Sequence, residues 1–333
     1  MDEKMKSRQQ RNKEVTITHY RKGGDGADLA LDQISDDVPD EELLWVDISS
    51  SDESLVRETA KRLGLSEVLA DRLASRRDGP WIDSDGSQFA VLVMAAVHEG
   101  NLAFHGAPFA LAAGKNVILS VHADPLNFVD ELRSREGRRS RVGALTAESF
   151  VASLLGWHLD SYFQAASDYE RYVERLEESV LRSHEGERLN ELRQLRKGAS
   201  RLRRMLAPHR YIFSSLARPD FRPDTCSEAK KQFTLLADHY ERAMDVIENA
   251  RDLMIGSFEL FSNQVALQTN ETMRVLTFIT IVIGLQTVVA GVLGMNFDAP
   301  FFKTHALGFW IALVGMGVLC IGSLLVGRWR RWY

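Results

Sequence analysis

Two uncharged stretches decide the fold: VLTFITIVIGLQTVVAGVL (275–293) and LGFWIALVGMGVLCIGSLLV (307–326). At about 1.5 Å per residue, each is long enough to cross the roughly 30 Å hydrocarbon core of a bilayer as a helix. The segment between them, 294–306, begins with Gly294-Met295-Asn296. The sequence therefore predicts a membrane hairpin over 274–333, with two spans and a short basic tail.

Charged residues at the ends of the spans predict how the hairpin is oriented. Arg274 precedes the first span and three arginines follow the second, whereas the segment between the spans holds only Lys303. Because cytoplasmic segments beside spans carry the excess of Lys and Arg, we expect both termini in the cytoplasm and the 294–306 loop outside. The start of the chain has no apolar stretch of signal-peptide type. We therefore expect an integral protein of a bacterial inner (plasma) membrane, in contact with lipid.

Composition limits the classes of function for the rest of the 333-residue chain. The net charge of −5 at pH 7 is small and spread out, which does not favour a nucleic-acid partner. Two cysteines, Cys226 and Cys320, do not make a disulfide framework. The sequence holds no HExxH, CxxC or P-loop motif, and its histidines show no ligand spacing. We predict that the protein is not an enzyme and has no catalytic cofactor.

Residues 15–142 are predicted to form a cytoplasmic α/β domain after a disordered segment, 1–14. Apolar runs predict strands at 15–20 and 43–49, a strand pair around the Asp-Gly turn within 81–97, and two strands within 102–122. Capping residues and periodicity predict helices at 51–65, at 66–76 and from Pro125 to about Arg135. The glycine-rich residues 23–26 lack the strand-to-helix setting of a phosphate loop and are interpreted as a turn.

Residues 143–273 are predicted to form a helical bundle and stalk. The Leu-, Glu- and Arg-rich stretch 145–218 predicts two long antiparallel helices that break near 183–186. A third helix begins near Ser227, and no proline interrupts it before the first span. We expect one helix of about 65 residues, or roughly 100 Å, that continues into the membrane. The fold class is thus an α+β cytoplasmic domain, with a mixed sheet flanked by helices, plus a long helical stalk and two C-terminal transmembrane helices.

A polar stripe along this third helix, which we call the seam, is the main functional signal. Steps of three and four residues place nine positions on it: Asn263, Ala266, Asn270, Met273, Thr277, Thr280, Gly284, Thr287 and Gly291. The heptad spacing turns one face of the helix toward a common axis in an oligomer. Two roles fit the stripe, close helix packing through small residues or the wall of a wet pore. Met273 and Leu276 are candidates for an apolar constriction, with plain helix packing as the alternative.

The Gly294-Met295-Asn296-Phe297 sequence, directly after the first of two terminal spans, resembles the CorA family of divalent-cation transporters, which includes the ZntB zinc transporters. The resemblance implies a CorA-like homo-oligomer, a pentamer, that carries Mg²⁺ through an axial pore, with Co²⁺, Ni²⁺ and Zn²⁺ as further candidate ions. It assigns selectivity to the Gly-Met-Asn motif, a gate to Leu276, and pore-facing positions to the asparagines, Met273 and the Thr and Gly residues of the seam. A ring of Asn296 amide oxygens suits Mg²⁺, which gives up its water shell reluctantly. By residue type alone, Gly294 and Asn296 could instead cap the helix.

The sequence departs from the family's pattern in two places. Leu293 stands where the family usually has an aromatic residue before the glycine, and the outer loop offers only Asp298 as a carboxylate, opposed by Lys303. A weaker negative charge concentrates cations less at the outer mouth, which bears on the transport rate and the preferred metal. His305 near the second span is interpreted as an interfacial residue.

An acidic stripe lies upstream on the third helix, at spacings of three, four or seven residues: Asp238, Glu241, Asp245, Glu248, Asp252 and Glu259. A solvated helix face is the ordinary explanation. In an oligomer the same carboxylates would repel each other unless divalent cations bridged them, and bridging would favour a closed state. By resemblance to the family, Asp252 and Glu259 are the candidate regulatory metal ligands, so that a divalent cation (Mg²⁺ or Zn²⁺) is both substrate and regulator.

Two further functions remain open from the sequence. The protein could be a proton-coupled zinc importer of ZntB type, or a membrane-anchored, metal-sensing scaffold whose hairpin only packs. The Gly-Met-Asn-Phe start of the loop favours Mg²⁺ and Co²⁺ over zinc.

Overall fold

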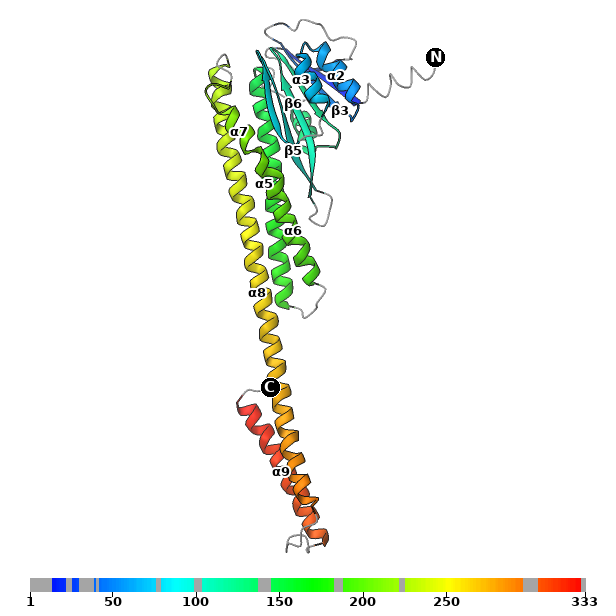
Figure 1. Cartoon of the computed structure of the whole chain (residues 1–333), viewed down its shortest axis with the longest axis vertical. Coiled ribbons are helices and arrows are strands. Elements are labelled where there is room, and N and C mark those ends of the chain that lie inside the picture. The colour runs from blue at the N-terminus through cyan, green and yellow to red at the C-terminus, as the bar shows by residue number, and fades with distance from the viewer. Residues whose placement is uncertain are drawn as a thin grey trace, which may run out of the picture. The chain divides into compact units, whose positions relative to one another are not determined.

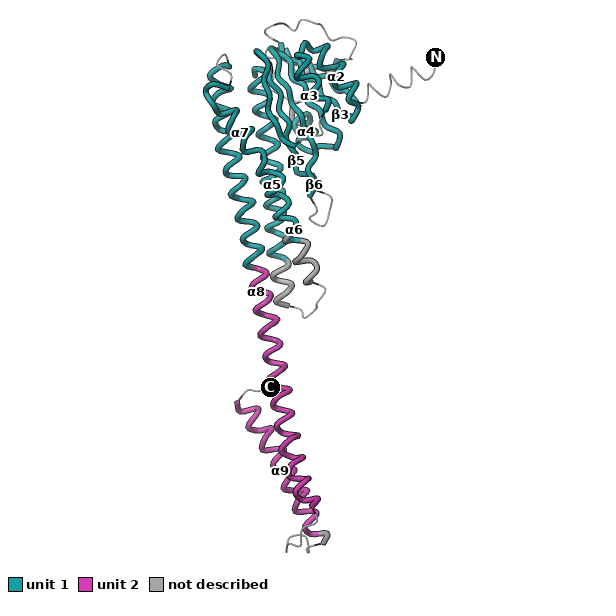
Figure 2. Tube along the Cα trace, in the orientation of Figure 1, with its two compact units in different colours: residues 1–256 teal, residues 257–333 magenta. Residues whose placement is uncertain are grey.

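The computed structural model of the chain is shown in Figure 1. It describes residues 14–21, 26–29, 39, 42–75, 79–98, 104–136, 145–182, 188–221, 225–295 and 305–330. The predicted disorder of the N-terminus and the predicted turn at 23–26 therefore fall almost entirely outside the described residues. The chain divides into two units, residues 1–256 and residues 257–333 (Figure 2), and each is described by itself.

The described part of unit 1 contains a seven-stranded sheet in the order β2-β1-β3-β7-β6-β5-β4. Its strands are β1 (Val15–Arg21), β2 (Gly26–Leu29), β3 (Glu42–Ser49), β4 (Trp81–Asp85), β5 (Gln88–His98), β6 (Phe104–Ala113) and β7 (Val117–His122). The β3–β7 pair is parallel and the other neighbouring strands are antiparallel. The sheet is thus mixed, as predicted. Strand β2 was missed because four residues beside a glycine-rich run carry too weak a pattern.

The alternation of side chains along β3 divides them between two layers. Leu44, Val46 and Ile48 belong to an apolar cluster with the helices α2 (Glu53–Arg62) and α3 (Glu67–Ala74). On the opposite face, Trp45 packs edge-on against Phe150, with 5.2 Å between ring centroids. Phe150 belongs to α5 (Ala147–Arg182), so α2 and α3 cover one face of the sheet and α5 lies on the other (Figure 1).

Local signals in the sequence fix the ends of the short helices and the turn between β4 and β5. The Asp52 carboxylate accepts hydrogen bonds from the backbone amides of Ser54 and Leu55, which caps the N-terminus of α2. Gly64 follows this helix with φ of +72°, and Gly86 turns the chain between the two strands with φ of +58°. Both glycines adopt a left-handed backbone that other residues rarely tolerate.

The bundle differs from the prediction in its second helix. The helix α4 (Asn127–Glu136) precedes α5, which is followed by α6 (Arg188–Leu206), the 3-10 turn η3 (Ala207–His209) and α7 (Arg210–Leu216). The expectation of one helix up to residue 218 was therefore wrong, because Pro208 lacks the amide hydrogen needed to continue the α-helical ladder. The predicted break near 183–186 lies outside the described residues.

The third long helix is confirmed as one continuous element, α8 (Ser227–Leu293), of 67 residues. Within unit 1 it buries an apolar face at heptad-like spacing: Phe233, Leu236, Tyr240, Ala243, Met244, Ile247, Ala250 and Met254. Phe213 of α7 stacks on Tyr240, with 5.2 Å between ring centroids. In unit 2 the C-terminal part of α8 is followed by α9 (His305–Trp329).

Candidate functional site

Unit 2 contains the apolar surface that the sequence predicted. By length and composition, the C-terminal part of α8 and the stretch Leu307–Trp329 of α9 qualify as membrane-crossing helices. Only 6% of the most apolar window of α8, and 0% of that of α9, is buried within the chain. A core helix of a soluble protein would be mostly covered, so these surfaces require lipid or other copies of the chain.

One stripe of each apolar helix packs against the other. On α8 the less exposed positions are Val275, Phe278, Val282, Gln286, Val289 and Leu293, and on α9 they are Gly308, Ala312, Met316, Cys320, Ser323 and Gly327. These spacings of three and four residues mark one face of a helix. The α9 stripe consists mainly of small residues, which let two helices approach closely in a membrane. Packing through small residues is therefore the role of α9 in this hairpin.

The seam lies on the other side of α8. Val275, Val282 and Gln286 each follow a seam residue by two positions, which corresponds to a rotation of about 200° around the helix. All nine seam positions are exposed in the single chain. A Cβ atom added at Gly284 or Gly291 would have no other atom within 4 Å. The small residues of the seam are thus not used to pack α9, which leaves contact with lipid, with other copies or with water.

Three seam threonines share one hydrogen-bonding pattern. The hydroxyls of Thr277, Thr280 and Thr287 donate to the backbone carbonyls of the residues four positions earlier, at 2.8, 2.8 and 2.9 Å between oxygen atoms. The single hydroxyl hydrogen is thereby used inside the helix, while the oxygen keeps acceptor capacity. The uncovered face of the span consequently presents a row of oxygen acceptors, which is the ligand type that hard divalent cations and their water shells prefer.

The remaining predicted pore residues are also uncovered. Asn263 and Asn270 are exposed, and the side chains of Met273 and Leu276 are each 55% exposed. At the end of α8, the Gly294 amide donates to the Ala290 carbonyl at 2.9 Å, as in a continuing helix. Gly294 does not have a positive φ, so a left-handed cap is not formed there. Asn296 and Asp298 lie outside the described residues, and with them the outer end of the predicted pathway.

The acidic stripe separates into two sets. Glu241 pairs with Arg210 of α7 at 2.8 Å, and Glu248 pairs with Arg203 of α6 at 3.0 Å. The other four carboxylates follow each other at seven-residue intervals, in register with the seam, and all are exposed: Asp238, Asp245, Asp252 and Glu259. Of these four, Asp252 has Arg251 at 3.8 Å, and the other three form no ion pair with the described residues. The four remain available to ligands or to other copies of the chain.

Two buried histidines of unit 1, His158 and His209, have structural partners. The Met94 amide of β5 donates to Nε2 of His209 at 2.8 Å, while Nε2 of His158 and the hydroxyl of Tyr162 donate to the Met94 carbonyl at 3.0 and 2.6 Å. Burial, and then the neighbouring His209, lowers the pKa of His158 to about 3, and burial lowers the pKa of His209 to about 4. Both rings are neutral at physiological pH and join α5 and η3 to the sheet.

A second buried network joins β3, β7 and α4. One Asp47 carboxylate oxygen accepts from Arg133 at 2.6 Å and lies 3.2 Å from Nε2 of His122, and the other accepts from the Ser120 hydroxyl. Burial acts to raise the pKa of Asp47, but its hydrogen bond to His122 and the charges of His122 and Arg133 outweigh burial, so the pKa is lowered. The network holds α4 against the central strands β3 and β7 of the sheet.

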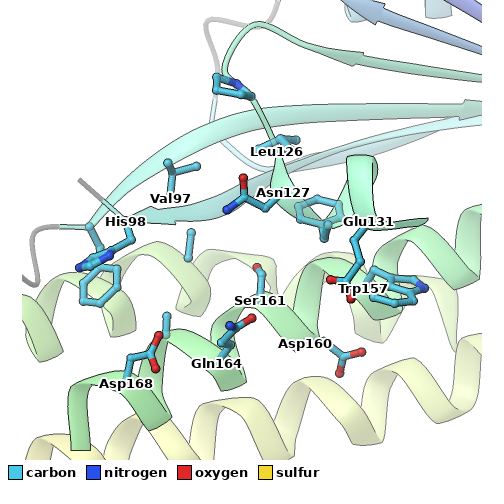
Figure 3. A pocket seen from close by; sticks show the side chains of 15 residues that line it. Val97, His98, Leu126, Asn127, Glu131, Trp157, Asp160, Ser161, Gln164 and Asp168 are labelled. Carbon is cyan, nitrogen blue, oxygen red and sulfur yellow. The ribbon is translucent and has the colours of Figure 1, made fainter. Parts of the chain in front are cut away.

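Unit 1 also has a pocket of about 490 Å³ between the end of β5, the start of β6, α4 and α5 (Figure 3). Two of its three carboxylates are engaged elsewhere, since Asp160 pairs with His239 at 3.2 Å and Asp168 pairs with Arg171. Among the described residues, no group of three or more His, Cys, Asp or Glu side chains is arranged to hold a metal ion. The exposed oxygen-rich face of α8 is therefore the candidate site.

Comparison with known proteins identifies the family. The family model described as "CorA-like Mg2+ transporter protein" matches residues 40–326. The chain belongs to this CorA-like family. Its members are transporters of divalent cations rather than enzymes, so the apolar parts of α8 and α9 are membrane spans in this family.

Individual relatives support the CorA-like assignment over most of the chain. The chain is 24% identical to the cobalt/magnesium transport protein CorA of Thermotoga maritima over 291 residues, which cover 86% of this chain and 83% of the relative. It is 26% identical to the divalent cation transporter CmaX of Pseudomonas aeruginosa over 316 residues, 93% of each chain. The solved CorA magnesium transporter of Methanocaldococcus jannaschii has the same fold, with a TM-score of 0.76 at 20% identity, covering 94% of this chain and 97% of that one.

One polar residue within the spans of this CorA-like chain was missed by sequence reasoning. Gln286 is the only amide in the stretch 275–293, and its Nε2 donates to the backbone carbonyl of Met316 on α9 at 2.9 Å. It lies off the seam, so a search for pore-lining positions passes over it. The signal that could have found it is its isolation, because a lone amide in an apolar span needs a partner.

Proposed function

We propose that this CorA-like chain assembles as a homopentamer and carries Mg²⁺ through an axial pore lined by the seam. The supporting observation is the geometry of the hairpin. The helix α9 packs on one face of α8, whereas the threonine and glycine seam on the other side stays uncovered. Several copies of α8 that turn their seams inward would enclose hydroxyl oxygens, and the α9 helices would then face lipid.

Specific roles follow from this arrangement. The motif Gly294, Met295 and Asn296 would select the ion at the outer mouth, where a ring of amide oxygens holds a hydrated Mg²⁺ without stripping its water. Met273 and Leu276 would form the apolar constriction that closes the pathway by excluding water. Asp298 would supply the one carboxylate of the outer loop, and a single carboxylate per copy concentrates cations only modestly at the mouth. Because this bears on the preferred metal, Co²⁺, Ni²⁺ and Zn²⁺ are tested beside Mg²⁺.

Substitution of Thr287 by leucine tests the pore directly. Under the proposal, Thr287→Leu places bulky apolar groups on the axis and reduces Mg²⁺ uptake at least tenfold in proteoliposomes. Thr272→Leu is the matched control, because Thr272 also bonds its own helix, at 3.0 Å to the Gln268 carbonyl, but lies off the seam. Equal uptake by the wild type and Thr287→Leu, with both chains assembled, would contradict the pore.

The same vesicles distinguish the alternative transport modes. Uptake of Mg²⁺, Co²⁺, Ni²⁺ and Zn²⁺ is followed with and without a pH gradient, using a dye inside the vesicles. The proposal predicts Mg²⁺ entry that does not depend on the gradient. Zinc entry that requires a gradient would instead support a proton-coupled importer, and the absence of any ion entry would support a membrane-anchored scaffold.

The proposed location, in the inner membrane with both termini in the cytoplasm, is tested by labelling intact cells. A cysteine is placed near the N-terminus or the C-terminus of the chain, and a reagent that does not cross the membrane should fail to label either one.

A further inference from the structure

Within the hairpin, a side-chain hydrogen bond joins α8 to α9. The Gln286 side chain lies on the α9-facing stripe, and its Nε2 reaches the Met316 carbonyl at 2.9 Å. Every other residue on that stripe of α8, from Val275 to Leu293, is apolar. Apolar side chains against the small residues of α9 allow rotation and sliding, because lipid offers them nearly equal contacts. The Gln286 amide, by contrast, makes a directional contact with α9.

The position of Gln286 matters because it determines which way the seam points. The seam residues Gly284 and Thr287 lie two positions before and one position after Gln286. Any rotation of α8 about its axis therefore turns Gln286 and the seam together. A side chain fixed to a backbone carbonyl of α9 therefore also fixes the direction of the seam. An unmade bond would leave an amide in the apolar interface, which is unfavourable in a membrane and penalises other rotations.

We propose that Gln286 is a positioning residue that sets the rotation of α8 on α9, so that the seam faces away from α9. The expected effect of this residue on ion uptake rests on the proposed transport function, whereas its effect on the rotation of α8 does not. When the bond is removed, α8 samples other rotations, and the fraction of assemblies with every seam aligned falls. The Gln286 side chain touches no ion in this role.

A native cysteine allows the rotation to be measured without transport. The pairing of Gln286 with Met316 brings residue 282, about one turn earlier on α8, toward Cys320, about one turn later on the antiparallel α9. Both Val282 and Cys320 belong to the facing stripes. In a Cys226→Ser background, the thiol introduced by Val282→Cys should form a disulfide with Cys320 on mild oxidation. Its rate then reports how often the two stripes face each other.

The test compares two substitutions of the same chemical kind in the full chain. Gln286→Met keeps the length of the side chain and removes the donor. Gln268→Met is the control, because Gln268 is on the same helix and its side chain makes no hydrogen bond with the described residues. We expect Gln286→Met to slow the disulfide about threefold and to lower Mg²⁺ uptake per assembled particle by a similar factor, the size of one interhelical hydrogen bond in a membrane. The control should match the wild type in both.

Each outcome decides the matter. An unchanged disulfide rate in Gln286→Met would overturn the positioning role, and so would a slower disulfide with unchanged uptake. A loss of assembled particles alone, with normal rates in those that remain, would mean that Gln286 only stabilises the hairpin and would also overturn it. A wild-type chain that carries no Mg²⁺ would contradict the proposed function instead, which the disulfide rate does not measure.

Discussion

At the scale of single residues, several polar groups buried in unit 1 join its helices to the sheet. Met94 illustrates this, since its amide and carbonyl bind three side chains from α5 and η3. The rings of His158 and His209 lie 5.4 Å apart between centroids, and a proton on either ring would place a buried charge beside the other. These two histidines are therefore structural, and their low pKa values predict how the domain responds to acid.

Acid should destabilise unit 1 through this pair. In the unfolded chain each histidine binds a proton near pH 6.5, whereas in the folded chain the pKa is about 3 for His158 and about 4 for His209. Between pH 4 and pH 6.5 the unfolded state therefore binds more protons than the folded state. The stability that the two neutral histidines contribute is complete above pH 6.5 and is lost as the pH falls toward 4. We expect the melting temperature to fall by several degrees between pH 7 and pH 5. His158→Gln should weaken this dependence, whereas a substitution at the exposed His98 should leave it unchanged.

At the scale of elements, the two membrane helices have different packing surfaces. The helix α9 brings small residues to its partner, whereas α8 brings Val275, Phe278 and Val282. This division predicts opposite effects for one substitution at two positions of α9. Ala312→Leu should force α8 and α9 apart and destabilise the hairpin by about 1–3 kcal/mol. Gly315→Leu should instead stabilise the hairpin. No atom lies within 4 Å of the new Cβ, and a helix-favouring residue replaces glycine. Thermal unfolding in detergent measures both, and equal melting temperatures would contradict the assignment of the stripes.

The elements also show how far the sequence could predict the structure. The two long apolar runs predicted the C-terminal part of α8 and the whole of α9, because an uncharged stretch of about 20 residues has few alternatives to a membrane-spanning helix. The mixed sheet followed from alternation and from the Asp-Gly turn. Pro208 was visible in the sequence, but its neighbours are strong helix formers and their local propensity masked the break. The Gln286–Met316 contact could not be predicted, since it depends on the rotation of two helices that local pattern does not determine.

At the scale of the whole molecule, the proposal depends on copies of α8 meeting around an axis. The exposed carboxylates Asp238, Asp245, Asp252 and Glu259 continue the heptad line of the seam. Glu241 and Glu248, by contrast, are neutralised within the chain by Arg210 and Arg203. The first set would bring like charges together in an assembly, and the second set would not. The two sets therefore provide a matched comparison on one helix.

Divalent cations should protect the assembled stalk only through the first set. Carboxylates from neighbouring copies repel at close range, and a bridging Mg²⁺ converts that repulsion into attraction and favours the closed assembly. Asp252→Asn with Glu259→Gln should therefore abolish the Mg²⁺-dependent slowing of limited proteolysis. Glu241→Gln with Glu248→Gln removes the same charge but should retain the protection, because exposed ion pairs contribute little to stability. Limited proteolysis with and without excess Mg²⁺ decides between them. Protection that persists in the first double variant would show that these carboxylates face solvent and bind no ion, and the regulatory role would then have to be sought elsewhere along α8.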